Sequence, residues 1–452
     1  MADPDIWWHL RNAEYLVQTG SLPNQDMFSF TLAGQPWMNH EWLAELPFYA
    51  AWRAGGLPGI EALMIVLAEA VFLSLLYLCY RSSGNIKSAV VACLVWSFLA
   101  AVNFGPRMIL FGYLWLTLML IVLERYRSRG SSPLWTLPLL FALWANTHGS
   151  WLIGLIVFGI VVSDGFVRGR WGQIESNNWT PYQRKRLVAT GLASVAALFL
   201  NPFGWRLVTY PFEFASAQTL NVARVTEWAS LDFHDGRGKL TLIIIAVSLL
   251  IALARNYRWA LHEVELTLFG MYLGLTYIRF LFLFAVLSAP TLSRILTFVP
   301  DYDERIDKPT MNAVVILAIG GLLAAFAPLA APATHEEIVA RDFPAGALRY
   351  MEEHPVADRL FNYYSWGGYL GWRDRKLKVF IDSRMDIFEY GGIFQDYLDV
   401  SDIKDPETIL DKYEIGSVLF PASHRLTYLL SHTAGWKQVY RDDVSALFER
   451  SR

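Results

Sequence analysis

The stretch IEALMIVLAEAVFLSLLYLCY, residues 60–80, decides the class of fold. At roughly 20 residues, such a run is long enough to cross the hydrocarbon core of a bilayer as a single helix. The whole chain has the same character, because 54% of its 452 residues are hydrophobic, only 17% are charged and the mean hydropathy is +0.31. This composition excludes an ordinary soluble enzyme and indicates a membrane protein.

Nine further apolar stretches follow the first one along the chain. Several are shorter than the roughly 20 residues of a straight span, so one or two of them fit tilted, broken or hairpin helices. We therefore expect a polytopic α-helical membrane protein with about ten transmembrane helices. The nine stretches are residues 88–105, 108–124, 133–147, 151–167, 187–200, 240–254, 261–277, 280–298 and 311–330.

The distribution of lysine and arginine predicts how these helices cross the membrane. Cytoplasmic loops retain positive charge, and alternate loops of this chain are basic. The N-terminal segment, the less basic loops and everything after about residue 331 are therefore expected outside the cytoplasm. Because the basic residues are dispersed over loops, nucleic-acid binding is not supported. The basic loops are residues 81–87, 125–129, 168–186, 255–258 and 294–308.

The segment 332–452 has a different pattern, in which short apolar runs alternate with helical patterns. Such alternation predicts a small α/β domain. KVFID at 378–382 is expected to be a strand, residues 336–355 a helix, and Asp405 the N-cap of a second helix. Asp382, Arg384 and Asp386 lie at the end of this strand, where they could bind an acceptor glycan or pair with one another, and pairing is the favoured reading. The predicted domains are an extracytoplasmic loop with amphipathic helices over 1–56, a transmembrane helical domain over 57–331 and an extracytoplasmic α/β domain over 332–452.

Unusual polar residues occur where this topology predicts the external face. Ionisable groups at membrane depth are costly, and they persist mainly where they line a cavity or take part in chemistry. Simpler roles are an interfacial aromatic belt for Trp7 and Trp8, and arginines that reach headgroup phosphates. The polar candidates are Asp3, Asp5, His9, His40, Glu41, Arg107, His148, Glu227 and Arg279.

One segment gives these residues a specific context: DPDIWWHLRNAEYLVQTGSLPNQDMFSFTLAGQPWMNHEWLAELPFY, residues 3–49. Its acidic pair, amphipathic helix, Gly-x-Pro turn and second polar cluster resemble the first external loop of the GT-C-fold glycosyltransferases. The protein O-mannosyltransferases and lipid A aminoarabinose transferases are similar examples. In that superfamily a transmembrane helix precedes the loop, so this chain is expected to lack the first helix.

The resemblance implies a transferase of the bacterial inner membrane that faces away from the cytoplasm. Its partners would be a polyprenyl-phosphate-linked sugar as donor, a glycan, lipid or protein as acceptor, and membrane lipid. Asp3 or Asp5 would be the catalytic base for an inverting displacement, and Trp7 and Trp8 would hold this loop at the membrane boundary. Arg107 or Arg279 would stabilise the leaving phosphate. Substrate contacts would come from His9, His40, Glu41, Arg107, His148, Glu227 and Arg279.

The same acids allow other roles. A divalent cation that bridges the phosphate is possible at Asp5, His9 and Glu41, although the residue spacing matches no specific metal motif. A non-catalytic structural subunit of a membrane assembly is a second reading, favoured by the short N-terminus. A transporter or polymerase for polyprenyl-linked glycans is a third, and a transporter predicts acids or broken helices near mid-membrane.

Overall fold

The computed structural model describes residues 3–100, 105–326 and 331–451, and most of them are helical. The chain forms two compact units. The first unit comprises Met1–Leu63, Phe212–Asn221 and Leu322–Arg452, so both ends of the chain belong to it. The second unit comprises Met64–Pro211 and Val222–Gly321.

A helix lies in each of the ten apolar stretches predicted from the sequence. Within the described residues, four helical segments are long and apolar enough to cross a membrane: Trp42–Ser83, Ile109–Arg129, Gly236–Ala254 and Ile278–Ile295. This agrees with a multi-pass membrane protein, while ten crossings remain a prediction. The helices are α2 (Trp42–Ser83), α3 (Ile86–Ala100), α4 (Ile109–Arg129), α5 (Thr136–Thr147), α6 (Trp151–Asp164), α7 (Pro181–Ala197), α10 (Gly236–Ala254), α11 (Leu261–Thr276), α12 (Leu281–Ile295) and α13 (Pro309–Phe326).

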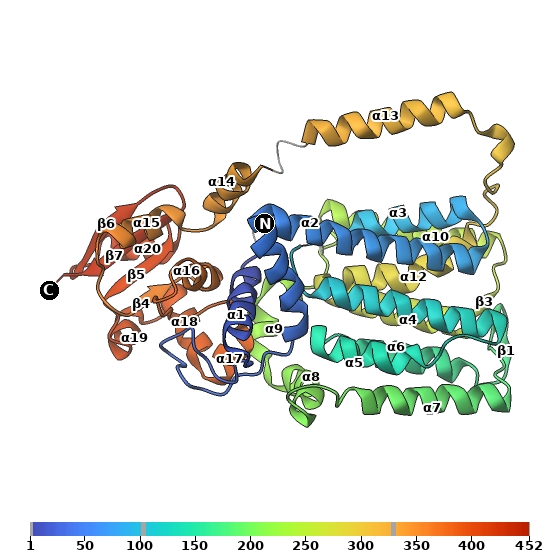
Figure 1. Ribbon diagram of the computed structural model, residues 1–452, viewed down its shortest axis with the longest axis horizontal. Coiled ribbons are helices and arrows are strands. Elements are labelled where there is room, and N and C mark those ends of the chain that lie inside the picture. The colour runs from blue at the N-terminus through green and yellow to red at the C-terminus, as the bar shows by residue number, and fades with distance from the viewer. Residues whose placement is uncertain (1–2, 101–104, 327–330, 452) are drawn as a thin grey trace. The chain divides into compact units, whose positions relative to one another are not determined.

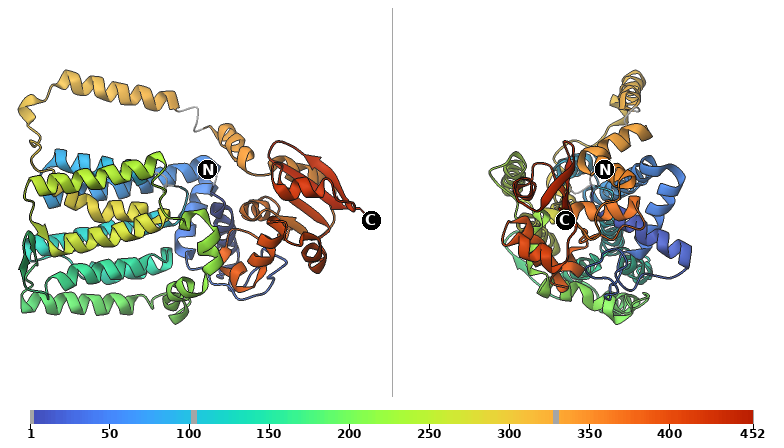
Figure 2. Two further views of the ribbon diagram at one scale, coloured as in Figure 1. Left: turned by 180° about the vertical axis from the view of Figure 1, so that it is seen from behind. Right: turned by 90° about the vertical axis from the view of Figure 1, so that its left-hand side faces the viewer.

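Most helices of the second unit run roughly along one direction and alternate in sense along the chain, so that alternate loops share an end (Figures 1 and 2). At one end a small sheet of order β1-β2-β3 joins two distant loops; its strands are Arg170–Trp171, Ile174–Glu175 and Trp259–Ala260. The Asn85 side chain also donates a hydrogen bond to the Val299 carbonyl at 2.7 Å. The loops predicted to be basic therefore lie together, at what we call the basic end.

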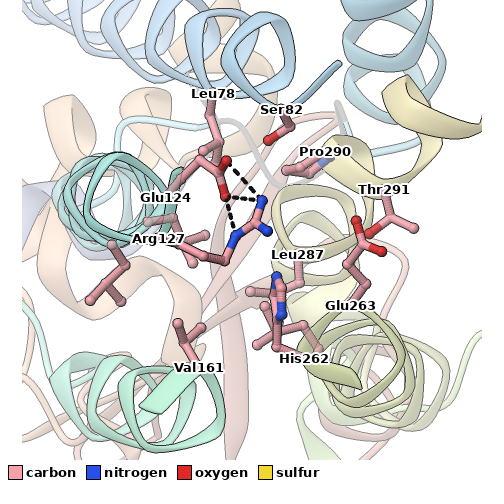
Figure 3. Close-up of a pocket in the computed structure, with 13 residues that line it drawn as sticks. Leu78, Ser82, Glu124, Arg127, Val161, His262, Glu263, Leu287, Pro290 and Thr291 are labelled. Atoms are coloured by element: carbon pink, nitrogen blue, oxygen red, sulfur yellow. Dashed lines mark hydrogen bonds and ion pairs between the residues drawn. The ribbon is translucent and has the colours of Figure 1, made fainter. Parts of the chain in front are cut away.

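Buried charges hold the helices together at the basic end (Figure 3). They surround a cavity of about 50 Å³ that His262, Glu263 and the Glu124–Arg127 pair help to line. His262 Nδ1 lies 2.7 Å from Asp164 Oδ2, which links α11 to α6. Glu263 is paired with Arg294 at 2.5 Å, which links α11 to α12. Each of these groups therefore has a polar partner, which lowers the cost of its burial.

The N-terminal part of the first unit is α1 (Asp5–Thr19), a loop, and the start of α2. α2 is kinked at Gly55 and Gly56, where Gly56 has φ 60° and ψ −140°, a conformation open mainly to glycine. The chain returns to this unit at the end of α8 (Trp205–Ala217) and the start of α9 (Thr219–Arg224). There, the Glu389 carboxylate accepts hydrogen bonds from the backbone N–H groups of Leu220 and Asn221, both at 2.7 Å.

The C-terminal part of the first unit is the α/β fold predicted for this segment. Its sheet has the order β4-β5-β7-β6, with β4 parallel to β5 and the other pairs antiparallel. The strands are β4 (Leu360–Asn362), β5 (Ser417–Pro421), β6 (Trp436–Arg441) and β7 (Ser445–Arg450). The helices are α14 (Pro332–Asp342), α15 (Ala345–Glu353), α16 (Gly367–Arg373), α17 (Met385–Tyr390), α18 (Ile393–Ser401), α19 (Pro406–Lys412) and α20 (Arg425–Leu430).

Two local predictions in this part were wrong, and a third was confirmed in position only. The helix expected over 336–355 is interrupted at Phe343, because a residue that precedes proline is disfavoured in the helical conformation. Residues 378–382 form isolated bridges through Val379, to Ser29 and Leu360, rather than a strand. Asp405 does occupy the N-cap position of α19, but with φ 52°, and its side chain makes no capping hydrogen bond.

Candidate functional site

The predicted acidic pair lies at the start of α1. Asp3 Oδ1 accepts a hydrogen bond from the backbone N–H of Asp5 at 2.9 Å, which satisfies one of the N–H groups that a helix leaves unpaired at its start. The indole N–H of Trp8 points to two acceptors, Asp5 Oδ1 at 3.3 Å and Ser383 Oγ at 3.2 Å. Asp3 is buried, whereas Asp5 is partly exposed. The two carboxylates therefore differ in environment, and Asp5 is held by a side chain one turn later.

Four residues further along α1, His9 is buried between two glutamates. Its Nδ1 lies 2.8 Å from Glu45 Oε1 and its Nε2 lies 3.4 Å from Glu41 Oε2. Glu45 also accepts hydrogen bonds from the side-chain amides of Asn12, at 3.2 Å, and Asn39, at 2.7 Å. Both ring nitrogens of His9 thus face carboxylates, which is the arrangement that an imidazolium ion needs.

The charges around His9 set its protonation. Burial alone would lower the pKa of His9, but the hydrogen bond and charge of Glu45, with the charges of Glu41 and Asp5, outweigh it and raise the pKa. Burial raises the pKa of Glu41, although His40 at 3.8 Å and His9 oppose this effect. Both groups therefore bind a proton more tightly in the folded protein than in the unfolded chain.

This arrangement predicts a pH-dependent stability. A group whose pKa is raised by folding contributes stability that is complete below its ordinary pKa, about 6.5 for histidine, and is lost as the pH rises through the folded value. We expect the thermal unfolding midpoint of the purified protein to fall as the pH is raised above about 6.5. The substitution His9→Gln should flatten this dependence. His234→Gln, at a side chain that is 99% exposed, should leave the slope unchanged, and equal slopes in both variants would contradict the prediction.

Trp7 and Trp8 are buried inside the protein, whereas an interfacial aromatic belt, one sequence-based reading, would require them to be exposed. Trp7 is only 1% exposed and Trp8 only 8%. The Trp7 ring makes edge contacts with Trp52, Phe343 and Tyr369, with centroids 6.2, 5.7 and 5.2 Å away. The two tryptophans therefore fix α1 inside the protein, because α1 and the C-terminal segments share one apolar core.

A buried ion cluster joins the loop 20–41 to the C-terminal segment. Arg384 donates through Nε and Nη2 to the carboxylate of Asp382, and through Nη2 to Asp26 Oδ1 at 2.6 Å. The guanidinium also lies 4.9 Å from the ring centroid of Phe28 and 4.8 Å from that of Trp37. The predicted Asp382–Arg384 pair is thus confirmed, and Asp26 is a third member that the sequence did not reveal.

The pKa values of the two carboxyls in this cluster shift in opposite directions. Burial raises the pKa of Asp382, and Arg384 compensates only in part. At Asp26, burial acts in the same sense, but the charge of Arg384 and the hydrogen bonds from Ser29 prevail and lower the pKa. Two carboxylates and one guanidinium would carry one net negative charge in the interior, so it is Asp382 that is more readily neutralised.

In the second unit, three predicted residues meet at the end opposite the basic end. Arg107 forms an ion pair with Glu227, and each side chain is 32% exposed. The Arg279 guanidinium lies 4.2 Å from the ring centroid of Trp228, the next residue after Glu227. The backbone N–H of Ile278 donates to the Ala229 carbonyl at 3.0 Å, which holds these two segments together. Both predicted arginines are therefore brought to the same region of the unit.

His148 follows α5 and has a defined hydrogen-bonding pattern. The backbone N–H of Ser150 donates to His148 Nδ1 at 3.0 Å, and Ser150 Oγ lies 2.9 Å from the same nitrogen. Ser150 Oγ also accepts the indole N–H of Trp144 at 2.9 Å. A nitrogen that accepts the Ser150 N–H carries no proton, so neutral His148 holds its proton on Nε2.

The structure thus groups the sequence-predicted residues into two sets, one in each unit. Asp3, Asp5, His9, His40 and Glu41 form the set in the first unit, and Arg107, His148, Glu227 and Arg279 belong to the second unit. Sequence reasoning missed Glu45, Asn12 and Asn39, which complete the surroundings of His9. Glu45 follows Glu41 by four residues, and this helical spacing at the start of an apolar helix was the available signal.

The residues proposed for a divalent cation do not fit one. Among the described residues, no group of three or more His, Cys, Asp or Glu side chains is placed to hold a metal ion. His9 is the clearest misfit, because each of its ring nitrogens is already within ion-pair distance of a glutamate. A metal ligand must present an unprotonated nitrogen, whereas this environment favours the protonated ring.

Known structures share this fold. No protein-family model matches the sequence, and no curated protein matches it. The oligosaccharyltransferase of Archaeoglobus fulgidus in its apo form is similar over 93% of this chain and 66% of its own, with a TM-score of 0.52 and 13% identity. The same protein tethered to an acceptor peptide containing the NVT sequon is similar over 100% of this chain and 70% of its own, with a TM-score of 0.54 and 13% identity.

This likeness establishes the fold alone. The chain spans about two thirds of the length of the oligosaccharyltransferase. Over nearly its whole length it shares the fold of that oligosaccharyltransferase. At 13% identity, a shared fold does not show that the two proteins catalyse the same reaction or bind the same substrates.

Proposed function

We propose that this chain is a membrane glycosyltransferase that moves a sugar from a polyprenyl-phosphate donor to an acceptor outside the cytoplasm of a bacterium. The observation that carries the proposal is the start of α1, where Trp8 orients the partly exposed Asp5 carboxylate within a GT-C fold. The acceptor is a glycan, a lipid or a protein. A peptide is the acceptor tethered to the structurally similar oligosaccharyltransferase, which makes protein one of these classes.

Asp5 is the better candidate for the catalytic base. A hydroxyl acceptor is a poor nucleophile at neutral pH, so a carboxylate must take its proton as the new bond to C1 of the sugar forms. Asp3 is buried, and its carboxylate already accepts the backbone N–H of Asp5 at the start of α1. Asp5 is more accessible, and its contact with Trp8 fixes its direction without neutralising its charge. Asp3 would then be a positioning residue.

The leaving group needs positive charge nearby, whereas the nucleophile needs a base. As the bond between C1 and the phosphate oxygen breaks, the lipid phosphate gains negative charge, and cations in a water-poor site stabilise it. Arg107 and Arg279, which meet in the second unit, supply that charge in the proposal, and His148 supplies an N–H donor. Direct displacement inverts the configuration at C1.

A structural subunit is the second candidate. It is favoured by the buried network in which Glu45 is bonded to His9, Asn12 and Asn39, because such a network also serves a purely structural role. The two candidates differ in one measurement. The purified full-length protein should transfer labelled sugar from a polyprenyl-phosphate donor if it is an enzyme, whereas a structural subunit should show no transfer and should co-purify with partner proteins.

The proposed orientation makes a separate prediction. Ser21 and Ser431 are exposed in the first unit, and Ser131 is exposed beside the basic loop that ends α4. In intact spheroplasts, a membrane-impermeant maleimide should label the variants Ser21→Cys and Ser431→Cys, but label Ser131→Cys only after lysis. The natural cysteines, Cys79 and Cys93, are buried and provide the unlabelled background. Labelling of Ser21→Cys and Ser431→Cys from opposite sides would exclude a shared extracytoplasmic site.

A further inference from the structure

An apolar groove lies between α10, α11 and α12 of the second unit. Its volume is about 340 Å³. Leu249 of α10, Leu268 and Met271 of α11 and Leu292 of α12 contribute to its walls, and Trp96 of α3 closes one side. The few polar side chains that line it belong to serines and threonines, and none is charged. Such a lining favours a hydrocarbon occupant over a polar one.

The helix on one side of the groove shows which solvent the groove opens to. From residue 241 to residue 254, α10 has no charged residue. Its outer face is apolar and open, since Leu242, Ile243, Leu250 and Leu253 are between 53% and 63% exposed. A soluble protein rarely exposes such a continuous apolar face. The groove therefore opens beside a surface that suits the acyl chains of a bilayer.

One end of the groove is formed by the small sheet of the basic end. Ile174 of β2 and Trp259 of β3 both line it. The exposed Arg258 directly precedes Trp259, and the exposed Arg170 lies in β1 of the same sheet. Arg255 is also exposed, with its guanidinium 5.1 Å from the ring centroid of Phe298. Three arginines accompany one acid of this sheet, Glu175, so the mouth of the groove has an excess of positive charge.

We propose that this groove binds a phospholipid with an anionic headgroup. One acyl chain fills the groove along α10 and α11, and the headgroup phosphate meets the guanidinium groups of Arg255 and Arg258. Arginine suits this role because its planar group donates two hydrogen bonds to a phosphate at once. Basic pockets between transmembrane helices bind anionic headgroups in this way. The site uses none of the residues assigned to glycosyl transfer, so it stands apart from the proposed function.

Native mass spectrometry of the full-length protein in detergent tests this proposal. Phosphatidylglycerol and phosphatidylcholine with identical acyl chains are titrated against the wild type, and phosphatidylglycerol should bind more tightly. In the double variant Arg255→Gln/Arg258→Gln this preference should weaken roughly thirtyfold, since each arginine near an anionic surface is worth about 1 kcal/mol. Arg129→Gln removes an exposed arginine of another basic loop and should have no such effect.

A separate variant tests whether the acyl chain occupies the groove. Leu249→Trp places a large ring in the groove and should reduce binding of either lipid, whereas Leu253→Trp, one turn later on the same helix and outside the groove, should not. Thermal unfolding of each variant shows that the fold is retained. Equal affinity for the two lipids, unchanged binding in Leu249→Trp, or displacement of phosphatidylglycerol by equimolar polyprenyl phosphate would overturn the proposal. None of these outcomes depends on transferase activity.

Discussion

The substitution Asp5→Asn is expected to lower the rate of sugar transfer by roughly 100- to 10,000-fold, the usual contribution of a general base. Asparagine has the same shape as aspartate, and its carbonyl oxygen can still accept the Trp8 indole N–H that Asp5 Oδ1 accepts at 3.3 Å. The start of α1 should therefore keep its structure while the proton acceptor is lost. Transfer of labelled sugar from a polyprenyl-phosphate donor by the purified protein measures the effect.

Two further variants separate the base from its surroundings. Asp3→Asn weakens the hydrogen bond at the start of α1 and should cost about 1 kcal/mol of stability, with a smaller effect on the rate. Trp8→Phe keeps a ring and removes the N–H that orients Asp5, so it should slow transfer roughly tenfold, as the loss of a hydrogen bond to a charged group does. If Asp5→Asn is folded and retains more than half of the wild-type rate, Asp5 is not the base.

The sequence predicted those features of this protein that depend on local patterns. Apolar runs of helical length fixed the positions of the helices, and alternating strand and helix patterns predicted the C-terminal α/β fold, because burial of apolar surface dominates both. Local rules failed where a competing contact was stronger. At Val379 the chain pairs on both sides, with Ser29 and Leu360, yet only through isolated bridges. Single bridges between distant segments, such as the one from Val379 to Ser29, leave no periodic pattern in the sequence.

The candidate site was predictable in residue type but only partly in arrangement. Asp3, Asp5, His9 and Glu41 stood out because charged residues are rare in this chain, and they do meet in one unit. Glu45 did not stand out, since a glutamate at the start of an apolar helix usually faces water. Its burial follows from His9, Asn12 and Asn39, which satisfy its oxygens from a different helix and from the loop. Contacts of this kind require the tertiary fold.

The second large effect is expected at the buried cluster of Arg384, Asp382 and Asp26. Arg384 is only 3% exposed, and both carboxylates are at most 2% exposed. Removing one partner of a buried ion cluster leaves charges that neither water nor a counter-ion compensates, which typically costs 3–5 kcal/mol. Arg384→Met keeps much of the side-chain volume and removes the charge. We expect its unfolding midpoint to fall by about 10 °C, a large part of the stability of an ordinary domain.

Arg384→Met should also disturb the position of Asp5, the proposed catalytic base. Trp37, whose ring faces the Arg384 guanidinium at 4.8 Å, makes an edge contact with Trp8 at 6.1 Å, and Trp8 holds Asp5. Loosening this loop should therefore slow transfer even at temperatures where Arg384→Met is folded. The triple variant Asp26→Asn/Asp382→Asn/Arg384→Met removes all three charges and should recover part of the lost stability, since no unpaired charge remains.

Arg375→Met is the matched control for Arg384→Met. Arg375 lies on the same segment, pairs with Glu14 at 2.9 Å and stacks on Trp372 at 3.8 Å from the ring centroid, but its side chain is 35% exposed. Water can replace what a partly exposed guanidinium loses, so this substitution should cost about 1 kcal/mol or less. If Arg384→Met unfolds within about 2 °C of the wild type, the cluster does not carry the stability assigned to it. The link between the loop 20–41 and the C-terminal segment would then rest on aromatic packing and on the hydrogen bonds of residues 28–31 to Val379 and Phe380.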